Sequence, residues 1–132
     1  MTASTALRAL REAIVLEHLE SENEREFDTA LGVFDHPRCE IVATGEVFDG
    51  AEEVAGYYAR LGAEFPDRRS RILELHHADC AVIVEVELEG TRPGEQSGPF
   101  RVRMTAFFVF DGARLVGKRV YGGRLGPEPA LA

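Results

Sequence analysis

Tryptophan is absent from this chain of 132 residues, and cysteine occurs only twice. Cys39 and Cys80 form no CxxC pair, so a disulfide is not expected and a reducing cytoplasm is the default location. Basic residues are also few, because 15 lysines and arginines stand against 23 acidic residues and give a net charge of −8. Nucleic acids and anionic membranes bind basic surfaces, so neither is an expected partner.

Long apolar runs are absent as well. No run approaches the roughly 18 residues that span a bilayer, and residues 1–19 are amphipathic rather than typical of a secretory signal. We therefore expect a soluble cytoplasmic protein. Its length suits one domain, which we place at residues 1–126, followed by a flexible tail at 127–132.

The first half of the chain has the periodicity of helices. Apolar residues recur at helical spacing over residues 7–19 and again over 27–34. Ser21 and Glu24 form an S-x-x-E pattern that predicts a capping box at the start of the second helix. A third helix is expected from Asp49, as its N-cap, to the Phe-Pro-Asp sequence at 65–67.

The second half changes to the two-residue period of strands. Strands are predicted at about 71–77, 81–90, 100–110 and 114–121, after a short strand at 39–43. The sequence FDGA at 110–113 is typical of a two-residue hairpin turn. Helices followed by an antiparallel meander indicate an α+β domain, with the helices packed on one face of a strongly curved sheet.

Alternating charge predicts how two of these strands pair. We expect Glu87 opposite Arg101 and Glu85 opposite Arg103, because opposite charges across a ladder stabilise it.

The last strand has two possible registers. A two-residue Asp-Gly turn would point Arg119, Tyr121 and Gly123 into the concave face of the sheet. A three-residue bulged turn would instead point Lys118, Val120 and Gly122 inward. We favour the first register.

Four stretches together resemble a known superfamily. They are HPRCEI at 36–41, FDGAEEVAGYYARLGAEFPD at 48–67, VEVELEGTRPG at 84–94 and FFVFDGARLVGKRVYGGRLG at 107–126. In this order they are similar to SnoaL-like polyketide cyclases and ketosteroid isomerases of the nuclear transport factor 2-like superfamily. The resemblance implies a cone-shaped (cystatin-like) barrel, in which N-terminal helices pack in the concave face of a curved antiparallel sheet. It also implies a deep, mostly apolar pocket, although this fold alone does not name a function.

The acids that the resemblance implies are missing. The cyclase acid near the end of the last strand falls on the Gly122-Gly123 pair. The two positions at which the isomerases carry an acid correspond to residues 42–43 and to Ala106, and neither is acidic here. The position of the isomerase tyrosine in the first helix corresponds to His18. The familiar cyclase and isomerase reactions are therefore not expected in their usual form.

Two residues are the candidate catalytic groups. His18 is able to act as a base near neutral pH, and Tyr57 would polarise an oxygen. The alternative for both is a core residue that only packs. Candidate substrate-binding residues share the concave face: Tyr58, Met104, Phe108, Arg119, Tyr121 and Gly123. Among them, Arg119 would orient an anionic group.

Neither a metal nor a cofactor is expected. The pair His76-His77 suggests a metal site, but neighbouring residues of a strand point to opposite faces and zinc needs three or four converging ligands.

The sequence thus predicts a SnoaL-like protein that binds a small hydrophobic molecule in its barrel pocket. Two interpretations stay open: a cyclase- or isomerase-like enzyme without the usual acid, or a non-catalytic ligand-binding or dimerisation module of the same fold. The outer sheet face bears Phe107, Val109, Val116 and Val120, and such exposed apolar faces are typical of interfaces. We therefore expect a homodimer through this face.

Overall fold

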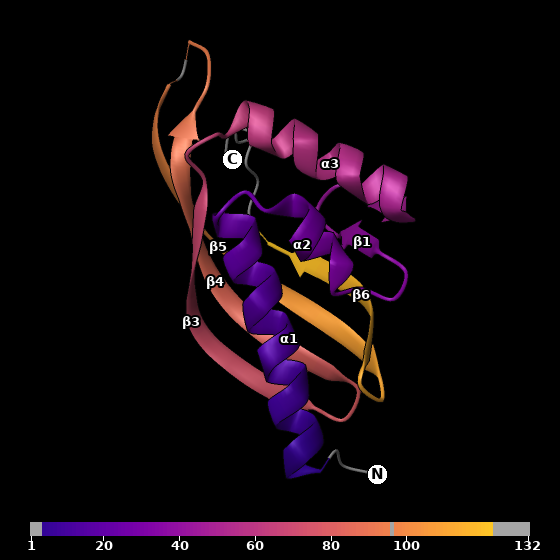
Figure 1. Ribbon diagram of the computed structural model, residues 1–132. Helices are drawn as coiled ribbons and strands as arrows, with labels where there is room; N and C mark the ends of the chain where they lie inside the picture. The colour runs from indigo at the N-terminus through magenta and orange to yellow at the C-terminus, as the bar shows by residue number, and fades with distance from the viewer. Residues whose placement is uncertain (1–3, 96, 123–132) are drawn as a thin grey trace.

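The computed structural model describes residues 4–95 and 97–122. Three helices lie on the concave side of one curved sheet (Figure 1). The predicted α+β class with N-terminal helices is confirmed. The predicted boundary at residue 126, the tail and Gly123 lie outside the described residues. No helix within those residues is long and apolar enough to cross a membrane.

The first helix, α1, runs from Thr5 to Asn23, and the hydroxyl of Ser4 caps it by accepting from the Leu7 N–H. The predicted capping box is wrong, because Ser21 lies buried inside α1. Beyond the C-cap residue Glu24, Arg25 has a φ of 64° and lets the Glu26 N–H donate back to the Ser21 carbonyl.

Two shorter helices follow. Helix α2 spans Phe27–Gly32, and α3 spans Ala51–Glu64. Gly50, not Asp49 as predicted, is the N-cap of α3 and makes no side-chain cap. The Asp49 N–H instead donates to the Glu53 carboxylate.

Six strands form the sheet in the order β2-β1-β6-β5-β4-β3. They span Arg38–Ile41 (β1), Glu46–Asp49 (β2), Arg69–Ala78 (β3), Ala81–Arg92 (β4), Gly98–Asp111 (β5) and Arg114–Tyr121 (β6). Only β1 and β6 are parallel. Strands β2 and β3 form the two edges and do not pair with each other over the described residues, so the sheet is curved but unclosed.

The predicted pairing of β4 with β5 is wrong by two residues. Glu87 lies opposite Arg103, and Glu89 lies opposite Arg101. A shift of two keeps every side chain on its own face and every charged pair opposite in sign, so the sequence pattern does not distinguish the two registers.

The favoured register of the last strand is also wrong. Gly112, with a φ of 60°, and Ala113 form the turn, which lies one residue beyond the predicted one. A bulge then leaves Val116 without a partner between β5 and β6. As a result Lys118 pairs with Phe108 on the concave face, whereas Arg119 pairs with Phe107 on the outer face.

Candidate functional site

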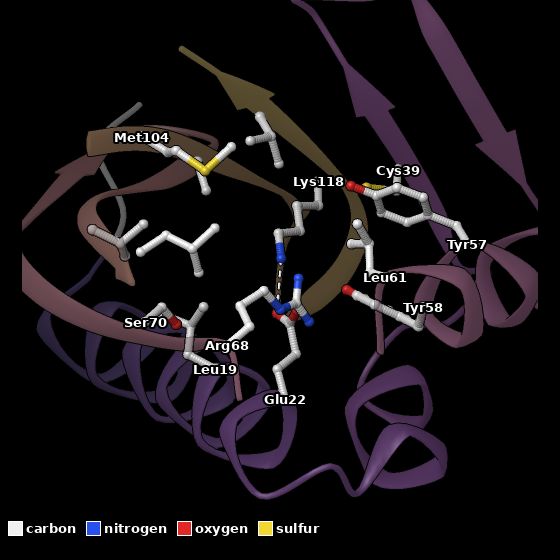
Figure 2. Close-up of a pocket in the computed structure, with 14 residues that line it drawn as sticks. Leu19, Glu22, Cys39, Tyr57, Tyr58, Leu61, Arg68, Ser70, Met104 and Lys118 are labelled. Carbon is white, nitrogen blue, oxygen red and sulfur yellow. Dashed lines mark hydrogen bonds and ion pairs between the residues drawn. The ribbon is translucent and has the colours of Figure 1, made fainter. Parts of the chain in front are cut away.

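A cavity of about 70 Å³ lies between α1, α3 and the concave face of the sheet. Much of its lining is apolar, including Leu61, Val86 and Met104. The polar side chains that line it are Glu22, Cys39, Tyr57, Tyr58, Arg68, Ser70 and Lys118. Figure 2 shows Glu22 from the helical side and Lys118 from β6 meeting at this cavity.

Glu22 is the acid of the site. It lies on the last turn of α1 and is 8% exposed. Its Oε1 atom lies 2.8 Å from Lys118 Nζ and 2.8 Å from His18 Nε2. The Lys118 side chain is itself 9% exposed. A carboxylate buried in this way is stable only when it is paired and hydrogen-bonded, and here two partners share one oxygen.

His18 lies behind Glu22 and is fully buried. Its Nδ1 atom lies 2.8 Å from the Ala30 carbonyl, which accepts a hydrogen bond, so Nδ1 holds a proton. Its Nε2 atom lies 2.8 Å from Glu22 Oε1 and 3.3 Å from Lys118 Nζ. The Tyr58 hydroxyl lies 3.3 Å from the same Nε2. Both ring nitrogens are thus engaged by the protein.

These contacts set the charge state of Glu22. Burial alone would raise the pKa of this carboxyl, but Lys118 and His18 outweigh it and hold the pKa well below its usual range. Glu22 is therefore an ionised carboxylate at neutral pH.

The neighbouring hydroxyl and thiol groups shift the other way. Burial raises the pKa of both Tyr57 and Tyr58, and the negative charge of Glu22 adds to the effect. Burial also raises the pKa of Cys39. The tyrosines therefore remain hydrogen-bond donors, and Cys39 remains a thiol, at neutral pH.

Two oxygens of the site remain free of the protein. The ion pairs and hydrogen bonds that Glu22 forms with described residues involve Oε1, and none of those residues hydrogen-bonds to Oε2. The Tyr57 hydroxyl likewise has no hydrogen-bond partner among them. Both residues line the cavity, so a bound molecule would meet a carboxylate oxygen and a phenolic donor.

The structure brings several predicted residues together. Tyr57, Tyr58 and Met104 line the cavity. His18 lies behind Glu22, and Phe108 packs beneath the His18 ring at 5.5 Å between centroids, so neither lines the cavity.

Arg119 and Tyr121 do not join this site. Both lie on the outer face, where the Arg119 guanidinium stacks 5.3 Å from the Phe107 ring centroid and 5.9 Å from that of Tyr121. Their predicted inward placement followed from the wrong register.

Sequence reasoning missed two of the charged residues that line the pocket, Glu22 and Arg68, and placed the third, Lys118, inward only in the less favoured register. Glu22 follows His18 by four residues, and this spacing puts both side chains on one helix face. That signal was present in the sequence. Lys118 points inward only when the turn has its bulge. Arg68 follows Pro66 and Asp67, where the pattern indicated no more than a helix end.

The His76-His77 pair divides between the two faces of β3, as expected. His77 contacts Glu12 of α1, whereas His76 lies beside Glu74 and Glu85 on the outer face. The ligand atoms of His76, Glu74 and Glu85 lie within 4.8 Å of one another. Exposed acidic groups often have this arrangement without an ion, so it identifies no metal site.

Comparison with known proteins places this geometry in a family. The sequence profile of the SnoaL-like domain matches residues 15–117, which include the second half of α1, all of α2, the segment from β1 to β5 and the start of β6. The chain belongs to the SnoaL-like domain family. The family resemblance read from the sequence is therefore confirmed.

Solved structures show the same fold at low sequence identity. A candidate SnoaL-like polyketide cyclase from Jannaschia sp. CCS1 has a TM-score of 0.79 and 14% identity, covering 92% of this chain and 90% of its own. A hypothetical protein with a ketosteroid isomerase-like fold from Catenulispora acidiphila, in complex with trimethylamine, has a TM-score of 0.73 and 21% identity, covering 82% and 83%. A phenazine biosynthesis-related protein from Pseudomonas aeruginosa has a TM-score of 0.75 and 15% identity, covering 96% and 92%. No curated protein matches this SnoaL-like chain in sequence.

Proposed function

We propose that this SnoaL-like protein binds a small, mostly apolar carbonyl compound in its pocket and moves a proton on it, as a cofactor-independent isomerase- or cyclase-like enzyme. One observation supports this most: Glu22 is a buried, ionised carboxylate that lines the cavity, and its Oε2 atom has no hydrogen bond with the described residues. The acid that appeared to be missing from the strands is thus supplied by α1.

Each group has a role in such a reaction. Glu22 Oε2 removes a proton from the carbon next to the carbonyl, and the electron pair of the C–H bond moves to the carbonyl oxygen as an enolate. Tyr57 donates a hydrogen bond to that oxygen, and the charge of Lys118 stabilises it. Return of the proton to a different carbon gives isomerisation. Attack of the enolate carbon on a second carbonyl gives ring closure.

His18 acts here through Glu22 rather than on the substrate. Its ring is held by the Ala30 carbonyl on one side and Glu22 on the other, so it fixes the carboxylate and leaves Oε2 free. The low pKa makes Glu22 a weak base, and the rate therefore depends strongly on stabilisation of the enolate.

Exchange of carbon-bound hydrogen tests this proposal. Small ketones and enolisable diketones are incubated with the protein in D2O, and deuterium at the carbon next to the carbonyl is followed by NMR. We expect the wild-type protein to accelerate exchange. Glu22→Gln should reduce this acceleration by roughly 10²–10⁴-fold, the usual contribution of a general base.

Two further variants make the exchange result decisive. Tyr57→Phe keeps the Glu22 contacts and should still reduce exchange by about 10²-fold, the usual effect of one lost oxyanion donor. Glu20→Gln changes an exposed residue of the same helix and should have no effect. Exchange that is absent throughout, or equal in wild-type and Glu22→Gln proteins, would refute the proposal.

A non-catalytic ligand-binding module is the second candidate function. The cavity of about 70 Å³ is small beside the roughly 300–1,000 Å³ of pockets for drug-sized ligands, so it suits a compact molecule, whether that molecule reacts or is only bound. Binding of a small carbonyl compound without hydrogen exchange would identify this function instead.

We also propose that two copies of this cytoplasmic protein associate through the outer sheet face. Phe107 and Val109 are half-buried there, Tyr121 is 37% exposed, and Arg119 stacks on the Phe107 and Tyr121 rings. Arg119 Nε is buried without a hydrogen-bond partner in the described part of the chain. A second copy would supply both apolar cover and polar partners. Val120, which sequence analysis assigned to this face, lines the pocket instead.

Light scattering after size exclusion tests the dimer. We expect the wild-type protein to elute as a dimer at micromolar concentration and Val109→Glu to elute as a monomer, since Val109 lies opposite Ala81 and Gly117 and a buried unpaired charge there opposes association. Leu10→Glu, on the exposed side of α1, is the matched control and should remain dimeric. A monomeric wild-type protein would contradict this interface.

A further inference from the structure

Arg68 is a buried cation whose guanidinium forms no hydrogen bond or close ion pair with the described residues. It is 7% exposed and lines the cavity. The charge of Glu22 attracts it across the cavity without accepting a hydrogen bond from it. Figure 2 shows it pointing into the cavity, toward the end where Glu22 and Lys118 meet. A buried guanidinium whose N–H donors have no acceptor is costly, so its place calls for an anion that accepts from it.

The obvious acidic neighbours are engaged elsewhere. The Asp67 carboxylate accepts from the Thr91 N–H at 3.1 Å and from the Thr91 hydroxyl at 2.6 Å. Glu22 contacts Lys118 and His18, and its Oε1 already has both at 2.8 Å. Glu22 attracts Arg68 through its charge, but neither acid lies within ion-pair distance of the guanidinium or accepts a hydrogen bond from it, so its N–H donors are available to a ligand.

Arg25 holds Arg68 in this position. From the end of α1, Arg25 Nη2 donates to the Pro66 carbonyl at 2.6 Å and to the Arg68 carbonyl at 2.5 Å. Its Nη1 donates to the Glu22 carbonyl at 3.2 Å. Arg25 thus ties the backbone of Arg68 to the backbone of Glu22, and the two charged side chains enter the cavity from fixed points.

The charge of the cavity differs in sign from that of the whole protein. Glu22 is the only acidic side chain among the described residues that line the cavity, whereas Arg68 and Lys118 are both basic. The chain as a whole has a net charge of −8. An excess of positive charge in an apolar cavity attracts anions much more strongly than the same charge would in water.

We propose that Arg68, supported by Lys118, binds the carboxylate group of a small apolar carboxylic acid, which makes a keto acid or a similar anion the substrate class of the pocket. This rests on the proposed function in assigning the carbonyl chemistry to Glu22, but the binding of the carboxylate does not. A guanidinium offers two parallel N–H donors that match the two oxygens of a carboxylate. The apolar lining from Leu61, Val86 and Met104 suits the hydrocarbon part of such a ligand.

Matched ligands of equal shape test the charge requirement. Isobutyrate and benzoate are compared with isobutyramide and benzamide by NMR titration of the full-length protein at pH 7 and low salt. We expect the carboxylates to bind at least about 10-fold more tightly than the amides, since hydrogen bonds to a charged group contribute roughly 1.5–3 kcal/mol.

Two arginine variants separate a specific contact from general charge. Arg68→Met keeps the length of the side chain and should remove the preference for carboxylates while leaving amide binding unchanged. Arg69→Met removes the same charge from the exposed neighbour and should keep the preference. A preference that survives Arg68→Met, or equal binding of acids and amides by the wild-type protein, overturns the proposal. Failure of every carboxylate to bind at about 10 mM also overturns it.

Glu22→Gln separates this site from the proton-transfer function. It should abolish hydrogen exchange, yet keep or strengthen carboxylate binding, because it removes the one negative charge near the ligand. Loss of exchange without a carboxylate preference would refute only the anion site. A carboxylate preference without exchange would refute only the proton transfer.

Discussion

Replacing Glu22 by alanine should lower the free energy of unfolding by about 3–5 kcal/mol. The substitution removes the carboxylate that lies 2.8 Å from both Lys118 Nζ and His18 Nε2. It leaves the Lys118 ammonium 9% exposed with no acid beside it, and buried charges without partners are among the costliest defects in a folded protein. Urea denaturation at pH 7 measures the effect.

The control for this stability experiment is Glu20→Ala on the same helix. Glu20 is exposed, so its replacement should change the free energy of unfolding by no more than about 0.5 kcal/mol. If Glu22→Ala were as mild as Glu20→Ala, the charge cluster would not be held as the structure shows it.

The second large effect should appear in acid. The pKa of Glu22 is lower in the folded protein than its ordinary value of 4.5, because Lys118 and His18 stabilise the carboxylate more than burial destabilises it. As the pH falls below that value, the unfolded chain takes up a proton at this position before the folded protein does. Stability that is fully present above pH 4.5 is therefore lost as the pH falls.

Glu22 should lower the free energy of unfolding at a fixed rate in acid. Between about pH 4 and pH 2 it is protonated in the unfolded chain but not in the folded protein, and this difference costs about 1.4 kcal/mol per pH unit. Subtracting the curve of Glu22→Gln from that of the wild-type protein isolates Glu22 from other acids with lowered pKa values, such as Asp67 and Glu85. Parallel curves for the two proteins would show that Glu22 has no lowered pKa.

The sequence predicted the architecture well because periodicity depends on burial. The change from helical to strand spacing gave the α+β class, and the last strand was predicted at 114–121, where β6 runs from Arg114 to Tyr121. The short strand β2 was missed because its four residues are too few to show a period and lie between two glycines, Gly45 and Gly50.

The site was harder to predict because it depends on register. The bulge at Val116 decides whether Lys118 or Arg119 faces the cavity, and a one-residue shift reverses every side chain that follows. Arg68 belongs to no periodic element, and its role follows only from what surrounds it in the fold. Glu22 was the one missed residue with a usable signal, since it lies one helical turn after His18.

The expected position of the acid was also misleading. The resemblance directed attention to the end of the last strand, where Gly122 has a φ of 81°. A Cβ atom built there would lie 3.4 Å from the Arg103 carbonyl oxygen, so this position favours glycine for backbone reasons. In this chain an acidic side chain, Glu22, lines the pocket from α1.

The most direct test of this account is the titration of Glu22 itself. The side-chain carboxyl carbon is followed by ¹³C NMR as the pH is lowered from 7, and the Glu22→Gln variant assigns the signal. The account predicts that Glu22 keeps the chemical shift of a carboxylate through pH 4.5, where ordinary glutamates take up a proton, and down to the pH at which the protein unfolds. Protonation of Glu22 at or above pH 4.5 in the folded protein would contradict it.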